Sequence, residues 1–124
     1  MSNIYIQCAS TGDSMADVCD YVSQQMYRQL TTSGRLRAGL QQIAPDARLV
    51  DAPAPKTLRD TDVAVAVFVT KKPLGMALSV FVTTANGGTI ETKRNLTVMD
   101  ARRAHGLAHY KRFLDRTIAA ATEE

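Results

Sequence analysis

Two histidines stand where a metal ion could be bound. His105 and His109 are four residues apart in a segment of helical character, so both imidazoles could reach one ion from one helix face. The glutamate of the H-E-x-x-H arrangement is missing, and no carboxylate or cysteine close by completes a ligand set. We therefore expect a surface histidine pair, with no metal and no cofactor.

A Gly-Asp-Ser block at residues 12–14 is similar to the nucleophile block of GDSL-type esterases, because it follows a strand-like segment and begins a helix-like one. A nucleophilic serine in that setting needs a histidine to take its proton and an aspartate three residues before that histidine. Neither His105 nor His109 follows an aspartate at that distance. The block is predicted to be an N-cap turn, and the protein not to be an enzyme.

The two cysteines, Cys8 and Cys19, are too few for a disulfide scaffold and lack the spacing of zinc ligands. Cys8 is expected on the core side of a strand and Cys19 on the packed face of a helix. A disulfide and a buried pair of thiols remain as alternatives, and the redox state of the compartment decides between them. The first residues show no signal peptide, so the chain is cytoplasmic or begins after a removed signal.

Basic side chains gather on one face of the last helical segment, opposite its apolar residues. These candidate anion-binding residues are Arg102, His105, His109, Arg112 and Arg116. Such a stripe could bind an acidic protein, an anionic glycan or a phosphate backbone. No ladder of aromatic residues and no glycine-rich RNA motif accompanies it, which disfavours nucleic acid. A solvated helix face is the simpler interpretation.

Length and composition describe one ordinary globular domain spanning residues 1–124. The chain has 124 residues, 45% of them hydrophobic and 22% charged, with a formal net charge of +3. It is long enough for a modest core and too balanced for a disordered or fibrous protein. No apolar run approaches the roughly 20 residues of a membrane span.

In the first half of the chain, residues 4–9 alternate like a half-buried strand, and residues 13–30 carry apolar side chains at helical spacing up to Gly34. Leu36, Leu40 and Ile43 suggest a second, short helix that Pro45 ends. A short strand is expected at 47–51, followed by a proline-rich loop.

The second half predicts an antiparallel meander of three strands, at residues 63–70, 76–83 and 90–98. With a four-residue loop at 71–74, the expected pairs are Val69 with Met76, Val67 with Leu78, Val65 with Val80 and Val63 with Val82. All eight side chains then lie on one face, as a buried side requires.

A last helix is expected at residues 101–121, where apolar side chains again recur on one face. The predicted order is β-α-(α)-β-β-β-β-α, an α/β two-layer sandwich in which helices cover one face of a mixed, mostly antiparallel sheet. Val65, Val67, Leu78 and Val80 should be buried beneath the helices.

The other face of this sheet is predicted to be an open docking surface. The residues that alternate away from the aliphatic core include Tyr5, Ala66, Phe68 and Phe81, together with Ala64 and Ala77. No further helix of clear amphipathicity remains to cover them, and exposed aromatic patches mark interaction sites. The alternative is that the segment at 36–43 or the proline-rich loop folds over this face.

The element order and the Asp-Val-Ala-Val-Ala-Val run at 62–67 resemble a group of bacterial envelope domains: the TolB N-terminal domain, CsgG, and the LpoB-type lipoproteins. The matching segments are 4–9, 13–30, 62–70, 75–84 and 89–100. The resemblance implies an adaptor or assembly role in the periplasm. The membrane-inserting hairpins of CsgG and a lipobox are not seen in this sequence.

The leading functional hypothesis is a non-enzymatic interaction or assembly module of a bacterial envelope system. Its open sheet face would bind a second copy, as a homodimer, or another envelope protein. The alternative is a small cytoplasmic domain that binds an anionic ligand or nucleic acid through the basic last helix. A disulfide between Cys8 and Cys19 would favour the first hypothesis.

Overall fold

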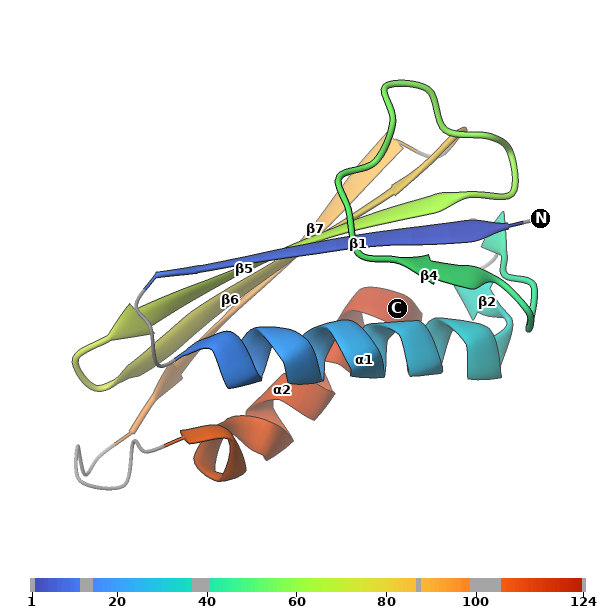
Figure 1. The fold of residues 1–124 in the computed structure, drawn as a ribbon. Helices are drawn as coiled ribbons and strands as arrows, with labels where there is room; N and C mark the ends of the chain where they lie inside the picture. The colour runs from blue at the N-terminus through green and yellow to red at the C-terminus, as the bar shows by residue number, and fades with distance from the viewer. Residues whose placement is uncertain (1, 12–14, 37–40, 87, 99–105, 124) are drawn as a thin grey trace.

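The computed structural model describes residues 2–11, 15–36, 41–86, 88–98 and 106–123. Seven strands and two helices follow one another in this part of the chain, confirming the predicted α/β two-layer sandwich (Figure 1). Their bounds, in chain order, are β1 (Asn3–Thr11), α1 (Ala16–Ser33), β2 (Arg35–Leu36), β3 (Gln41–Gln42), β4 (Arg48–Val50), β5 (Val63–Lys72), β6 (Gly75–Thr84), β7 (Gly88–Thr97) and α2 (Gly106–Glu123).

The main sheet has the strand order β4-β1-β5-β6-β7. Strand β1 is parallel to both of its neighbours, whereas β5, β6 and β7 form the predicted antiparallel meander. Both helices lie on the same face, with α1 against β1 and β5 and α2 against β6 and β7 (Figure 1). The face of the sheet that packs against the helices is therefore buried, and neither helix covers the opposite face.

The core lies between the helices and the sheet, where the sequence patterns place it. Val65 and Val67 are nearly fully buried, as are Leu78 and Val80. Their helical partners are Val18, Val22, Met26 and Leu30 from α1 and Tyr110, Leu114, Ile118 and Ala121 from α2. Helix α1 ends as expected at Gly34, which has a φ of 67° and donates its N–H to the carbonyl of Leu30.

The register of the β5–β6 hairpin differs by two residues from the prediction. Val69 lies opposite Leu78, Val67 opposite Val80 and Val65 opposite Val82, because Lys72 already pairs with Gly75. The connection is thus the two-residue turn Pro73-Leu74 and not a four-residue loop. A shift of two residues leaves every side chain on its predicted face of the sheet, so the predicted core residues are still buried.

Gly75 is required where the meander turns. Its φ is 152°, and a Cβ atom built on it would lie 1.8 Å from the carbonyl oxygen of Leu96. Only glycine allows β6 and β7 to approach this closely beside the turn.

The predicted helix over residues 36–43 is wrong. The described ends of this segment are the strands β2 and β3, which pair antiparallel, while Leu40 lies outside the described residues. The Ile43 N–H donates to the Gly34 carbonyl at 2.8 Å, so the chain reverses directly after α1. Leu36 and Ile43 are still buried in the core, as the apolar pattern predicts. A glycine at position 39 would also weaken a helix here by about 1 kcal/mol.

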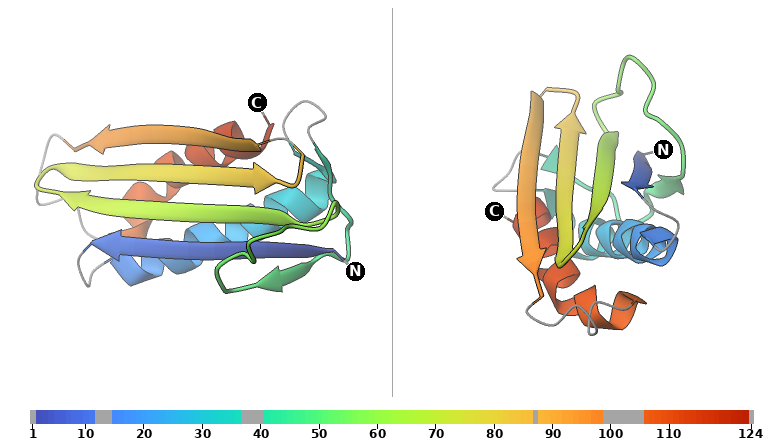
Figure 2. Two further views of the ribbon diagram at one scale, coloured as in Figure 1. Left: turned by 90° about the horizontal axis from the view of Figure 1, so that it is seen from above. Right: turned by 90° about the vertical axis from the view of Figure 1, so that its left-hand side faces the viewer.

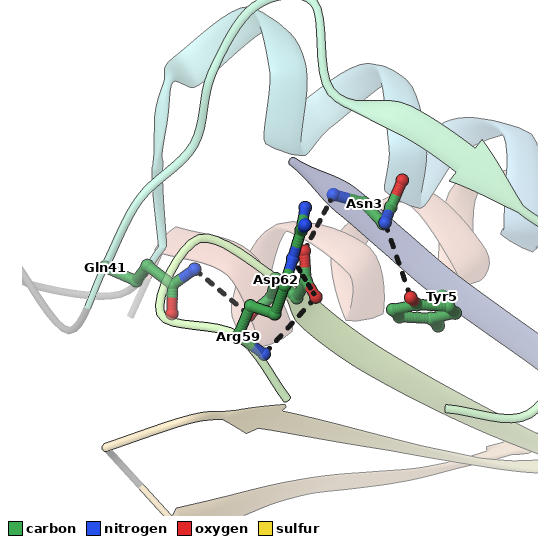
Figure 3. A network of polar contacts seen from close by, with 5 residues as sticks. All are labelled: Asn3, Tyr5, Gln41, Arg59 and Asp62. Atoms are coloured by element: carbon green, nitrogen blue, oxygen red, sulfur yellow. Dashed lines mark hydrogen bonds and ion pairs between the residues drawn. The ribbon is translucent and has the colours of Figure 1, made fainter. Parts of the chain in front are cut away.

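A buried carboxylate, Asp62, ties three segments together at the start of β5 (Figure 3). Its oxygens accept the backbone N–H of Asn3 at 3.0 Å and that of Arg59 at 3.3 Å. Its carbonyl accepts the side-chain amide of Gln41 at 3.1 Å, and the Arg59 guanidinium lies 3.5 Å from a carboxylate oxygen. Asp62 therefore joins the start of β1, the β3 strand and the loop before β5.

Replacing Asp62 with alanine is expected to lower the free energy of unfolding by about 1–3 kcal/mol. Two partly buried backbone N–H groups lose their acceptor, and leaving such donors unsatisfied carries a penalty of this size. Urea unfolding measures the change. Asp60→Ala is the matched control. Asp60 lies two residues before Asp62 and is exposed, so removal of its carboxylate should change the free energy of unfolding little. An Asp62 variant as stable as the Asp60 variant would contradict this role.

Candidate docking surface on the open sheet face

The face of the sheet opposite the helices carries two phenylalanines that contact each other at its centre. Phe68 projects from β5 and Phe81 from β6, and their rings meet edge to face with centroids 5.7 Å apart and planes at 86°. Phe68 is 48% exposed and Phe81 is half-buried. We call the exposed area around these two rings, with the neighbouring side chains of β5, β6 and β7, the aromatic face.

Strand alternation produces this arrangement. Val63, Val65, Val67 and Val69 of β5 enter the core, so the residues between them, Ala64, Ala66 and Phe68, point the opposite way. The register then sets Ala66 beside Phe81 and Phe68 beside Ser79. Each ring therefore has a small neighbour on the adjacent strand.

The edge strand β7 adds two opposite charges to the aromatic face. Glu91 pairs with Phe81 and Lys93 pairs with Ser79 in the β6–β7 register, and both charged side chains are exposed. Charges on an edge strand also discourage unwanted strand addition. Their place beside the rings gives the aromatic face a charged border.

Tyr5 lies on the same face but apart from the phenylalanine pair. It pairs with Ala64 and with Val50, toward the β4 edge, and its hydroxyl accepts the side-chain amide of Asn3 at 3.4 Å. Segment 51–62 passes over β1 and β4 at this end of the sheet and leaves β6 and β7 uncovered (Figure 2). Of the four residues predicted to bind a partner, Ala66, Phe68 and Phe81 come together, and Tyr5 borders them.

Cys8 and Cys19 form a disulfide that joins β1 to α1, with their Cα atoms 5.6 Å apart. The sequence leaves open a disulfide or a buried pair of thiols, and the structure has the disulfide. Beside the bond is a hollow of about 180 Å³ between β1, β4 and α1. Its polar lining consists of Asp20, Ser23, Gln24 and Asp51. The bond lies on the helical side of the sheet, away from the aromatic face.

The basic stripe is only partly within the described residues. Arg102 and His105 lie outside them, as does the side chain of His109, and so do residues 12–14 of the Gly-Asp-Ser block. Arg112 and Arg116 are exposed on α2. Within the described ranges, no three histidine, cysteine or acidic side chains gather as a metal site would require.

A contact between the helices escapes sequence analysis. The Tyr21 hydroxyl of α1 donates a short hydrogen bond to Asp115 of α2, and the Lys111 ammonium lies 5.8 Å from the centre of the Tyr21 ring. Burial, followed by the hydrogen bond and negative charge of Asp115, raises the pKa of Tyr21 to about 12. The phenol therefore stays protonated into the alkaline range, in which its hydrogen bond to Asp115 continues to link the helices.

The sequence was compared with models of known protein families and with curated proteins. No model of a known protein family matches the chain, and no curated protein matches its sequence. Among the described residues, neither helix has the length and apolarity needed to cross a membrane.

Proposed function

We propose that this protein is a non-enzymatic interaction module of a bacterial envelope assembly, and that it docks through the aromatic face. The observation that carries the proposal is the exposure of Phe68, which is 48% accessible in the middle of a sheet and not at a turn. Full burial of a fully exposed phenylalanine is worth roughly 1.5–3 kcal/mol, and a partner that covers the exposed half of Phe68 gains about half of that free energy.

The disulfide supports the envelope setting. Bonds such as that between Cys8 and Cys19 form and persist in oxidising compartments, which include the bacterial periplasm. The resemblance to envelope domains implies the same compartment. The cytoplasmic alternative relies on the basic stripe, most of which lies outside the described side chains.

The proposal is tested by changing Phe68 and Phe81 to serine together. The unmodified protein should associate with itself as its concentration rises, because self-association hides the rings, and the double variant should remain monomeric. The double variant should still melt in one cooperative transition, because neither ring belongs to the helical core. Sedimentation equilibrium measures association, and circular dichroism measures the melt.

Leu74 supplies the matched control. It is also 48% exposed, but it lies in the turn between β5 and β6 and not on the aromatic face. Leu74→Ser should therefore leave association unchanged. The proposal fails if the phenylalanine variant associates as strongly as the unmodified protein. It also fails if that variant unfolds, since the rings would then be part of an internal core.

A further inference from the structure

The aromatic face has a pattern that is complementary to itself. Two neighbouring cross-strand rows cross its centre. One row contains Ala66, Phe81 and Glu91, and the other contains Phe68, Ser79 and Lys93. Where one row has a small residue the other has a ring, and where one has an acid the other has a base.

Resting on the proposed function, we propose that the occupant of the aromatic face is a second copy of this chain, related by a two-fold axis that crosses the strands between these two rows. Such an axis lies in the interface and exchanges the rows. Phe68 of one copy then lies over Ala66 of the other, and Phe81 lies over Ser79. At the β7 border, Glu91 faces Lys93 of the other copy, twice.

This arrangement provides complementary contacts at the centre and at the border of the interface. Four rings occupy the centre, each above a small residue that leaves room for it, and two ion pairs lie at the border. The next rows outward face each other with polar side chains, such as Thr89 with Asn95. The segments 51–62 of the two copies lie at opposite ends of the strands, because the axis reverses the strand direction.

The area of the face sets the expected affinity. Three strands about 4.8 Å apart and about 27 Å of strand length give roughly 390 Å² per copy. Twice this area, about 780 Å², is below the usual size of a specific protein interface, so we expect a weak dimer with a dissociation constant on the order of 100 micromolar.

Charge reversal followed by mixing tests the arrangement. Glu91→Lys places two bases opposite two bases in the homodimer, and Lys93→Glu places two acids opposite two acids. Each variant alone should dimerise at least about tenfold more weakly than the unmodified protein. An equimolar mixture should regain nearly the original affinity, since both contacts are again between opposite charges. Both side chains are exposed, and unchanged melting temperatures confirm the folded state.

A steric variant separates this dimer from one formed by pairing of two β7 edges, which could also bring Glu91 near Lys93. Ala66→Phe fills the space that Phe68 of the other copy needs, and it lies on β5, two strands from that edge. It should weaken association at least about tenfold in the proposed dimer and leave an edge-paired dimer unaffected.

The outcomes distinguish this inference from the proposed function. If the phenylalanine variant is monomeric but mixing restores no affinity, or if Ala66→Phe has no effect, the two-fold arrangement is wrong and the docking surface stands. If the phenylalanine variant associates normally, the docking surface itself is wrong. Recovery on mixing, together with loss of association in Ala66→Phe, supports both.

Discussion

Replacing Leu78 with alanine is expected to lower the free energy of unfolding by about 2–5 kcal/mol. Leu78 is fully buried on β6, the strand that packs against α2. Truncation removes apolar contacts and leaves a cavity that the rigid sheet and helix cannot close completely. Urea unfolding followed by circular dichroism measures the change in the midpoint and in the extrapolated free energy.

Leu74→Ala is the control for Leu78→Ala. Leu74 belongs to the same hairpin but is exposed in its turn, so its loss should change stability by less than about 0.5 kcal/mol. A Leu78 variant that is as stable as the Leu74 variant would contradict the assignment of β6 to the core.

Loss of the Cys8–Cys19 disulfide should have the next largest effect. The bond closes a loop with a sequence separation of 11 residues, and the chain-entropy model gives about 3 kcal/mol for a loop of that size. The double variant Cys8→Ala/Cys19→Ala should be less stable by this amount in oxidising buffer. Urea unfolding with and without dithiothreitol measures it.

The reductant supplies an internal control for the disulfide. Dithiothreitol should lower the stability of the unmodified protein toward that of the double variant and leave the double variant unchanged. If the two proteins unfold together in oxidising buffer, the bond makes no contribution to stability.

The sequence predicts the buried face of the meander better than its register. The alternation in β5 and β6 assigns each side chain to a face, and a shift of two residues changes no assignment. The register depends on the turn, and Pro73-Leu74 lacks the Asn-Gly or Asp-Gly signal that identifies a two-residue hairpin. The loop length therefore could not be read from local residues.

Long-range contacts explain what else the sequence could not predict. Asp62 binds Asn3 across 59 residues, and Tyr21 binds Asp115 across 94, so no local spacing reveals either contact. The segment after Gly34 has apolar residues at helical spacing, yet its described ends form strands, because tertiary packing outweighs a short local pattern. The grouping of Phe68, Phe81 and Ala66 could be predicted, because strand alternation alone places their side chains on the same face of the sheet.

The central claim, that the aromatic face docks in solution, is tested most directly by nuclear magnetic resonance spectra of the ¹⁵N-labelled chain at increasing concentration. We predict that amide signals of β5, β6 and β7 around Phe68, Phe81 and Lys93 shift with concentration, while those along the exposed side of α1 stay fixed. The Phe68→Ser/Phe81→Ser variant should show no shifts. Spectra of the unmodified protein that are independent of concentration, or that change only on the helices, would contradict the account.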